Sequence, residues 1–147
     1  KANFNKKTYH LLSLAARSEK IENHNKYYKK KIILIDRFVD STIAYQHYGF
    51  GINFSIIEAI NEYLLKNFKV DFTFLNLVDK KNMVKRLNKR LSLNRYDKFK
   101  HSFYNKVQKG FLKLAKRKKN KYQIINSNLD IEYNKQVIRN RIDKLIK

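Results

Sequence analysis

The sequence contains no cysteine, no proline, three glycines and only 12 acidic residues among 147. The absence of cysteine excludes disulfides and thiolate metal sites, and it makes a reducing compartment, here the cytoplasm, the default expectation. No apolar run approaches the roughly 20 residues that span a bilayer, and we expect no signal peptide from Lys1-Ala2-Asn3. The four histidines show no metal-ligand spacing, so we expect them to be structural or exposed.

The charge is strongly one-sided, with 34 Lys and Arg and a formal net charge of +22. Such a balance is typical of nucleic-acid-binding proteins. The sequence is also rich in Lys, Asn, Ile, Phe and Tyr, which is the bias that an AT-rich coding sequence imposes without selection for polyanion binding. Because charge concerns association rather than fold, both interpretations stay open, and we favour the compositional one.

The most informative stretch is the aliphatic run of residues 32–35, followed by Asp36 and Arg37. Four consecutive aliphatic residues, three of them β-branched, predict a strand over 32–36 that is buried on both faces, as in a parallel sheet. In open α/β sheets, ligands bind at the carboxyl ends of strands. Further polar groups follow within ten residues, on Ser41, Thr42, Tyr45 and Gln46. Together they predict a site for an anionic, planar ligand.

The remaining pattern alternates between helix and strand. Helices are predicted over residues 6–28, 54–68, 80–89, 97–118 and 131–146, and further strands over 70–78 and 122–126. There is no linker and no repeat, which predicts one α/β domain over residues 1–147. The apolar side of the helix at 54–68 is expected to be a core or dimer face; it comprises Ile56, Ile57, Ile60, Tyr63 and Leu64.

Several isolated cations and one carboxylate invite a functional interpretation. Arg37 can grip a phosphate bidentately, which a lysine cannot. Arg17 lies beside Ala16 in an apolar stripe, so it needs a partner or a cleft unless it extends to solvent. Asp36 has no second carboxylate beside it, so paired acid–base chemistry is not indicated. Four cations crowd into ten residues and suit either a mobile phosphoryl-transfer lid or a solvated basic face; they are Arg86, Lys89, Arg90 and Arg95.

The segment Asp36-Arg37-Phe38-x-x-Ser41-Thr42-x-Ala44-Tyr45-Gln46 resembles the signature of thymidylate kinases, which transfer a phosphoryl group from ATP to dTMP. The resemblance runs from about Thr8 to the C-terminus, through Leu11-Leu12-x-x-Ala15-Ala16-Arg17, Val70-Asp71-Phe72-Thr73-Phe74-Leu75, Arg90, Asn94-Arg95-Tyr96-Asp97 and the helix from Phe103 to Ala115. It implies a P-loop nucleoside monophosphate kinase fold, a three-layer α/β/α arrangement with a parallel sheet. It also implies a lid over about 86–97 and a homodimer.

The resemblance implies a nucleoside-binding role for several matching residues. Arg17 would hydrogen-bond the thymine edge, together with Thr42 and Gln46. Tyr45 would pack against the deoxyribose and disfavour a 2′-hydroxyl, and Ser41 would belong to the same substrate site.

The resemblance also implies roles at the phosphates. Arg37 would hold the dTMP phosphate, and Asp36 would lie near Mg²⁺, through water. Arg90 and Arg95 would bring the cations of the lid to the phosphates of ATP, so that these two arginines and Arg37 act in catalysis.

Two departures from the family pattern matter. Ser13 stands where the family places a phenylalanine that stacks on thymine. Nothing matches G-x-x-x-x-G-K-[ST], the loop whose amides cradle phosphates, and three isolated glycines cannot form one. In the family that loop and its strand precede the helix at Thr8, so the resemblance implies a fragment, the C-terminal two-thirds of such a kinase.

The implied missing strand lies between the strands at 32–36 and 71–78, whose backbone groups would lose their partners. We therefore expect this chain alone to be unstable or inactive as a kinase. Two alternatives stay open. One is a basic nucleic-acid-binding module that uses the lysines and aromatics of residues 85–118. The other is a remnant that pairs with a separately encoded P-loop half.

Overall fold

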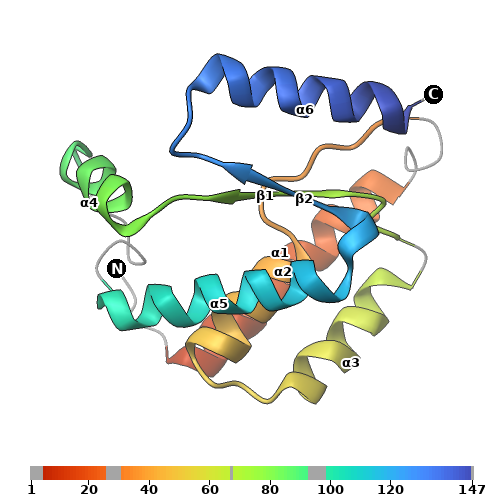
Figure 1. Ribbon diagram of the computed structural model, residues 1–147. Helices are drawn as coiled ribbons and strands as arrows, with labels where there is room; N and C mark the ends of the chain where they lie inside the picture. Colours follow the sequence, from red (N-terminus) through yellow and green to blue (C-terminus); the bar gives the residue numbers. More distant parts are fainter. Residues whose placement is uncertain (1–4, 26–30, 67, 93–98, 147) are drawn as a thin grey trace.

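The computed structural model describes residues 5–25, 31–66, 68–92 and 99–146. The elements follow in the order α1 (Lys6–Asn25), α2 (Val39–Thr42), π-helical η1 (Ile43–Gly49), α3 (Phe54–Leu65), β1 (Thr73–Leu77), α4 (Lys80–Asn88), α5 (His101–Arg117), 3₁₀-helical η3 (Lys119–Lys121), β2 (Tyr122–Asn126) and α6 (Ile131–Leu145). Figure 1 shows the two strands in the middle, with α6 over one face and α5, α2 and α1 over the other. The chain is thus a mostly helical α/β protein with a short parallel sheet.

The predicted helices are confirmed within the described residues, with ends that differ by a few residues; residues 26–28 of the first predicted helix lie outside those residues. The helix predicted over 54–68 ends at Leu65, and the one predicted over 97–118 begins at His101. Side-chain caps explain several starts, because an oxygen at the N-cap accepts a bond from an otherwise unpaired backbone N–H. Asn53 accepts from Ser55 N, Asp79 from Asn82 N, and Asp130 from Glu132 N and Tyr133 N.

The sheet contains β1 and β2, which pair in parallel from Thr73 opposite Tyr122 to Leu77 opposite Asn126. The strand predicted over 122–126 is confirmed, and the one predicted over 70–78 is shorter than expected. Parallel neighbours need a long crossover, and here α4 and α5 supply it. Leu75 and Ile125 are buried between the helices that cover the two faces.

The strand predicted over residues 32–36 is wrong. Residues 32–35 have no regular secondary structure, and Ile32, Leu34 and Ile35 are 66%, 82% and 45% exposed. An aliphatic run becomes a strand only where another backbone satisfies its N–H and C=O groups. In the part of the chain that is described, β1 and β2 pair with each other and neither pairs with this segment.

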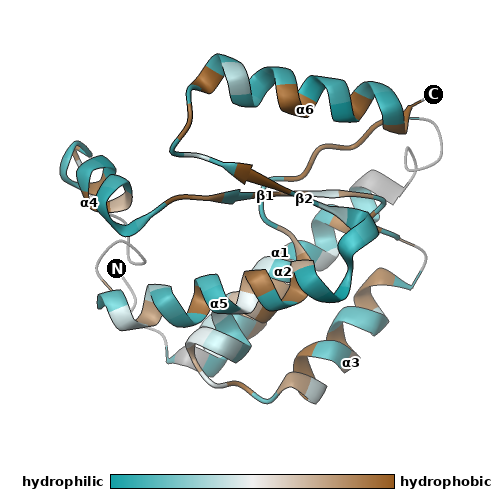
Figure 2. Cartoon of the chain, in the orientation of Figure 1, coloured by the Kyte–Doolittle hydropathy of each residue, from teal (hydrophilic) through white to brown (hydrophobic). Residues whose placement is uncertain are grey.

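The core lies where η1 packs against α3 and α5. Ile43, Ile57 and Leu114 form one buried cluster, and Ala44, Tyr45 and Val107 form another. Figure 2 shows hydrophobic residues along β2 and at intervals on α3 and α5, whereas α4 is mostly hydrophilic. The helices α5 and η1 approach closely at Gly110, which has no side chain; a Cβ at this position would lie 2.5 Å from the ring of Tyr48.

The apolar side predicted for α3 is only partly confirmed. Ile57 is fully buried, but Ile56 is 53% exposed and Tyr63 is 79% exposed. The inward side carries Asn61 instead, one helical turn beyond Ile57. Two leucines of α1 are also largely exposed, Leu11 at 58% and Leu12 at 50%.

No helix in the described ranges combines the length and the apolar character that a membrane span needs.

Candidate functional site

Arg17 on α1 connects three parts of the chain. Its Nη2 donates a hydrogen bond to Thr42 Oγ1 at the end of α2, and its Nη1 donates to Asn61 Oδ1 on α3 at 3.4 Å. The guanidinium carbon also lies 5.5 Å from the centroid of the Phe38 ring. Burial lowers the pKa of Arg17 from its usual value, but a guanidinium stays charged at neutral pH. A half-buried cation is therefore held by two oxygens and an aromatic face.

The helix that follows Phe38 carries most of the predicted ligand residues. It begins as α2 and continues without a break as η1, which is π-helical and carries the buried residues Ile43, Ala44, Tyr45 and Gln46. Such π-helical turns are rare in proteins, and those that occur are often found at functional sites. Thr42, Tyr45 and Gln46 are buried, whereas Ser41 is half-buried.

Arg37 precedes this helix in an unusual conformation. Its φ is 60°, in the left-handed region that a residue with a side chain seldom adopts. The side chain is exposed, and its guanidinium carbon lies 5.2 Å from the centroid of the Tyr45 ring. Conformations of this kind are maintained where the surrounding structure fixes them, often at ligand sites. Asp36, the preceding residue, is also exposed.

The cations predicted for a lid are not all described. Arg90 is exposed and follows α4, which lies at one side of the molecule, apart from α1 and α3 (Figure 1). Arg95 lies outside the described residues, as do residues 93–97 of the predicted lid. The structure therefore joins Arg17 to Thr42 and Arg37 to Tyr45.

Two polar residues that the sequence interpretation missed lie beside this cluster. Asn61 is 5% exposed, and its Nδ2 has no hydrogen-bond partner. His10 is 4% exposed, and neither of its ring nitrogens has a partner. Burial and the charge of Arg17 lower the pKa of His10. A signal was available, because Asn61 interrupts the apolar stripe of α3 and His10 lies one turn before Leu14 on the buried side of α1.

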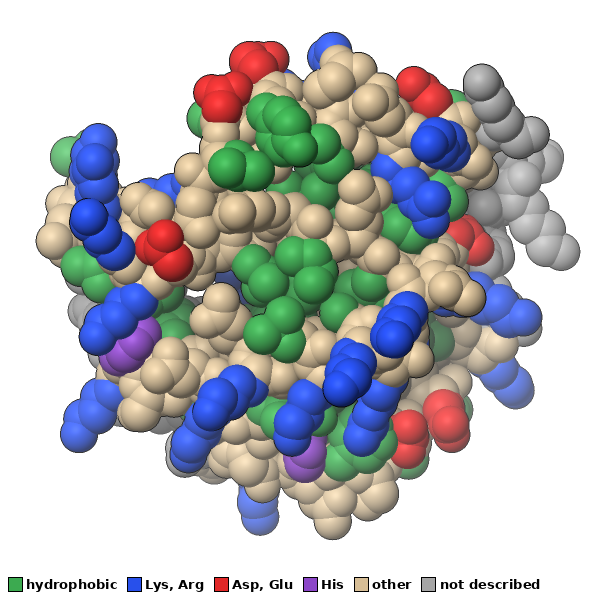
Figure 3. All heavy atoms as spheres, in the orientation of Figure 1, with side chains coloured by type: hydrophobic (Ala, Val, Ile, Leu, Met, Phe, Trp, Pro, Cys, Tyr) green, Lys and Arg blue, Asp and Glu red, His purple; other side chains and the backbone are tan. Residues whose placement is uncertain are grey.

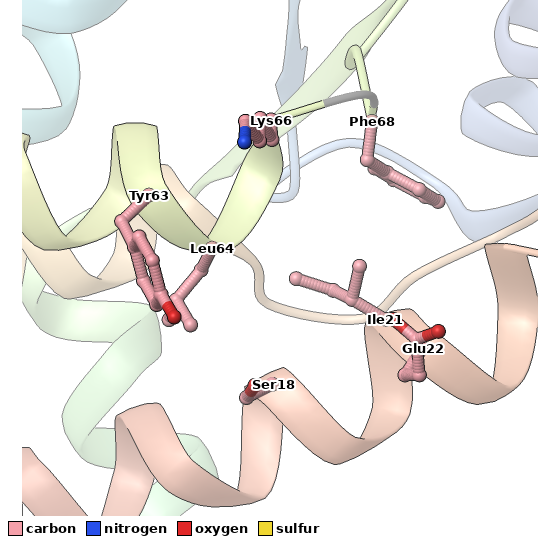
Figure 4. A pocket seen from close by; sticks show the side chains of 7 residues that line it. All are labelled: Ser18, Ile21, Glu22, Tyr63, Leu64, Lys66 and Phe68. Atoms are coloured by element: carbon pink, nitrogen blue, oxygen red, sulfur yellow. The ribbon is translucent and has the colours of Figure 1, made fainter.

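A cavity of about 320 Å³ lies between α1 and the end of α3. Figure 4 shows Ser18, Ile21 and Glu22 of α1 opposite Tyr63 and Leu64 of α3, with Lys66 and Phe68 from the segment after α3. None of the predicted ligand residues lines it. It is therefore a neighbour of the Arg17 cluster rather than the site itself.

A metal centre built from the protein alone is not present in the described ranges, because they contain no cluster of three or more His, Asp or Glu side chains suited to an ion. Magnesium does not need such a cluster, since one or two carboxylates commonly bind it together with substrate phosphates and water. A single exposed carboxylate, Asp36, next to Arg37 in the sequence, is compatible with that mode.

Comparison with known proteins gives one consistent answer. Residues 1–138 match the sequence profile of the family described as Thymidylate kinase. A thymidylate kinase of Sulfurihydrogenibium sp. (strain YO3AOP1) is 36% identical over 100 residues, which are 68% of this chain and 48% of that protein. One from Mycoplasma capricolum subsp. capricolum is 34% identical over 141 residues, which are 92% of this chain and 66% of that protein.

The fold agrees with the sequence matches. The crystal structure of thymidylate kinase from Ehrlichia chaffeensis superposes with a TM-score of 0.68 at 27% identity, over 99% of this chain and 68% of that one. The chain spans about half the length of the curated relatives it matches first. Since the family profile covers 138 of 147 residues, the chain belongs to the thymidylate kinase family.

Proposed function

We propose that this chain supplies the dTMP-binding part of a thymidylate kinase, which transfers the γ-phosphoryl group of ATP to dTMP and yields dTDP and ADP. The observation that carries the proposal is a pair of arginines that contact side chains of the α2–η1 helix. One, Arg17, is fixed by Thr42 and Asn61, and the other, Arg37, lies over Tyr45. One cation thus faces a buried polar cluster while the other is exposed.

The buried cluster suits the thymine base. Arg17 has five N–H donors in a rigid fork, and its bonds to Thr42 and Asn61 fix the plane of that fork. A remaining N–H can donate to a carbonyl oxygen of the base. Asn61 Nδ2 is a buried donor without a partner, and a ligand acceptor would offset the cost of leaving it unpaired. Gln46 is a further buried amide for the same edge.

The exposed arginine suits the 5′-phosphate. Arg37 can bind two phosphate oxygens at once, and Tyr45 beside it would pack against the deoxyribose, with Ser41 at the same helix start. In the transfer, a phosphate oxygen of dTMP forms a bond to the γ-phosphorus while the bond from that phosphorus to the leaving ADP oxygen breaks. Mg²⁺, held by Asp36 through water, would neutralise charge on the phosphates when bound, and Arg90 and Arg95 would do the same from the lid.

The ATP side needs groups that this sequence does not contain. No G-x-x-x-x-G-K-[ST] motif occurs in the 147 residues, and that loop supplies the backbone N–H groups that hold the phosphates of a nucleoside triphosphate. We propose that the chain is an N-terminally incomplete P-loop kinase, which binds dTMP and does not turn it over alone. Turnover of dTMP with ATP by the purified chain at ordinary kinase rates would contradict this part of the proposal.

We also propose that the chain forms a homodimer through α1 and α3. Both helices expose large apolar side chains, namely Leu11, Leu12, Ile56 and Tyr63. Exposed large apolar side chains on two helices that pack against each other favour an interaction site there.

The nucleic-acid alternative is less well supported. Figure 3 shows Lys and Arg side chains along α5, below hydrophobic side chains that gather over the sheet. Binding of single strands needs exposed aromatic rings for stacking, but Phe103 packs against Tyr45 and Phe50. The groove of about 600 Å³ beside α5 is lined by Leu112, Ala115 and Ile124 as well as two lysines, which suits no phosphate backbone.

Calorimetric titration of the purified chain with dTMP tests the proposal. We expect saturable binding that Arg37→Ala weakens at least tenfold, since a charged hydrogen bond contributes about 1.5–3 kcal/mol. Arg139→Ala on the exposed part of α6 is the matched control and is expected to bind as the parent does. Absence of dTMP binding by the parent chain, or salt-dependent binding of arbitrary DNA without preference for dTMP, would refute it.

A further inference from the structure

The first residue of β2 is tied to the first turn of α2. The Tyr122 hydroxyl donates a hydrogen bond to Asp40 Oδ2, across 82 residues of sequence. The Asp40 side chain is only 17% exposed, and Lys118 Nζ lies 3.8 Å from its Oδ1. A mostly buried carboxylate is costly unless it is paired. Here Oδ2 accepts the bond from the phenol, whereas Oδ1 has no hydrogen-bond partner among the described residues and only the ion pair with the Lys118 ammonium.

The bond places a constraint on the start of a short helix. This helix runs without a break through α2 and η1, from Val39 to Gly49, and a helix of that length has little stability of its own. Side-chain contacts must therefore set its direction. Asp40 connects it to the sheet through Tyr122, and Thr42 connects it to α1 through Arg17.

The same helix start carries the strained Arg37. Its φ of 60° lies three residues before Asp40, and the Phe38 carbonyl between them accepts a bond from Ser41 N at 3.0 Å. A strained conformation persists only if its surroundings over-determine it. Because Tyr122 holds Asp40 in place, the helix that follows residues 36–38 has a fixed position, which helps to maintain the conformation of Arg37.

The donor keeps its proton over the whole useful pH range. Burial, then the hydrogen bond to Asp40 and the charge of that carboxylate, raise the pKa of Tyr122 well above its ordinary value, and a bond with Thr73 opposes this only in part. The Tyr122 hydroxyl therefore remains a donor at neutral pH.

We propose that Tyr122 and Asp40 form a positioning pair, which sets the geometry with which Arg37 meets the 5′-phosphate of the nucleotide and touches no ligand atom itself. This inference rests on the proposed function, because it assigns the pair to the dTMP site. It predicts that loss of the pair affects the phosphate-dependent part of binding. The nucleoside part depends on Arg17, which α1 supplies and which also bonds Asn61 on α3, so it is less dependent on the start of α2.

The test compares two ligands, dTMP and thymidine, by calorimetry on the whole chain. In Tyr122→Phe and in Asp40→Ala, the Kd for dTMP is expected to rise about tenfold, the effect of losing roughly one charged hydrogen bond, while the Kd for thymidine changes less than about twofold. Asp40→Asn keeps an oxygen that accepts a hydrogen bond from the phenol, so this variant is expected to bind dTMP more tightly than Asp40→Ala does, with a Kd close to that of the parent. Tyr133→Phe, at a tyrosine that is 58% exposed on α6, is the matched control.

Each other outcome has a definite meaning. An unchanged Kd for dTMP in Tyr122→Phe overturns the positioning pair, and so does an equal loss of dTMP and thymidine affinity, which indicates a merely structural role. Far-UV circular dichroism shows whether a variant has folded; where Asp40→Ala has not, Tyr122→Phe and Asp40→Asn decide alone. A parent chain that binds thymidine or dTMP but loses neither with Arg37→Ala refutes the proposed phosphate site instead, and the pair with it.

Discussion

Arg17 Nη2 donates a hydrogen bond to Thr42 Oγ1, which joins α1 to the end of α2 across 25 residues of sequence. Asn61 accepts a second bond from the same guanidinium. Because the two acceptors come from different helices, the fork of one arginine sets the relative orientation of α1, α2 and α3. The candidate base-binding cluster and the packing of the helices thus depend on the same side chain.

Replacing Arg17 by lysine tests this double role. A lysine keeps the charge but has no planar fork with which to bond both partners. We expect Arg17→Lys to lower the free energy of unfolding by about 1–3 kcal/mol, because buried Thr42 and Asn61 lose a partner, and to weaken dTMP binding at least tenfold. Urea denaturation and calorimetry measure the two effects. Arg139→Lys on α6 is the control, and equal behaviour of the two variants would contradict the prediction.

Helices were predicted from sequence more reliably than strands, for a physical reason. The stripe and the cap that define α6 lie within residues 130–145, and Asp130 caps it as a local pattern requires. Residues 32–35 have the strongest strand composition in the chain and form none, because a strand depends on a partner elsewhere in the polypeptide. Composition indicates that a run is apolar; it does not supply the neighbour.

The candidate site was predicted as a set of residues and not as an arrangement. The segment around Arg37 and the isolated Arg17 were both singled out, but the bond from Arg17 to Asn61 spans 44 residues, and no local pattern encodes it. The positive φ of Arg37 was equally invisible, since arginine has no preference for that region. The functional roles of these residues remain predictions.

His10 predicts how stability depends on pH. It is buried, both ring nitrogens lack partners, and burial and the charge of Arg17 place its folded pKa below its ordinary value of 6.5. The unfolded chain therefore binds a proton more readily, so the free energy of unfolding falls as pH decreases from about 7 through 6 and continues to fall until the folded pKa is passed. Urea denaturation at several pH values measures this slope.

The variant His10→Leu removes the titrating group. We expect its free energy of unfolding to change less between pH 7 and 5 than that of the parent, because most carboxylates titrate below that window. A parent and variant with parallel pH profiles would show that His10 does not contribute. The comparison uses the slope rather than the absolute stability, so a change in packing at position 10 does not affect the conclusion.

Replacing Gly110 on α5 by alanine is expected to have two opposing effects on the free energy of unfolding. Alanine is favoured over glycine in a helix by about 1 kcal/mol, but its Cβ would lie 2.5 Å from the ring of Tyr48, and overpacking typically costs about 1–3 kcal/mol. We expect the second effect to dominate, so that Gly110→Ala lowers the free energy of unfolding. The double variant with Tyr48→Leu should recover most of the loss in urea denaturation. A Gly110→Ala variant that is more stable than the parent would show that α5 can move away from η1.

The proposed dimer face predicts a change in assembly without a loss of fold. Ile56 and Tyr63 are 53% and 79% exposed in the single chain, so replacing them removes little buried surface from the protomer. In a dimer through this face the same side chains would be buried, and a charge there would be desolvated without a partner. We expect Ile56→Lys and Tyr63→Lys to convert a dimer to a monomer in light scattering, with an unchanged circular dichroism spectrum. Ile131→Lys places the same charge on α6, where the isoleucine is 68% exposed, and should leave the mass unchanged. A parent chain that is monomeric at micromolar concentration, or a dimer that survives both substitutions on α3, would exclude this face as the interface.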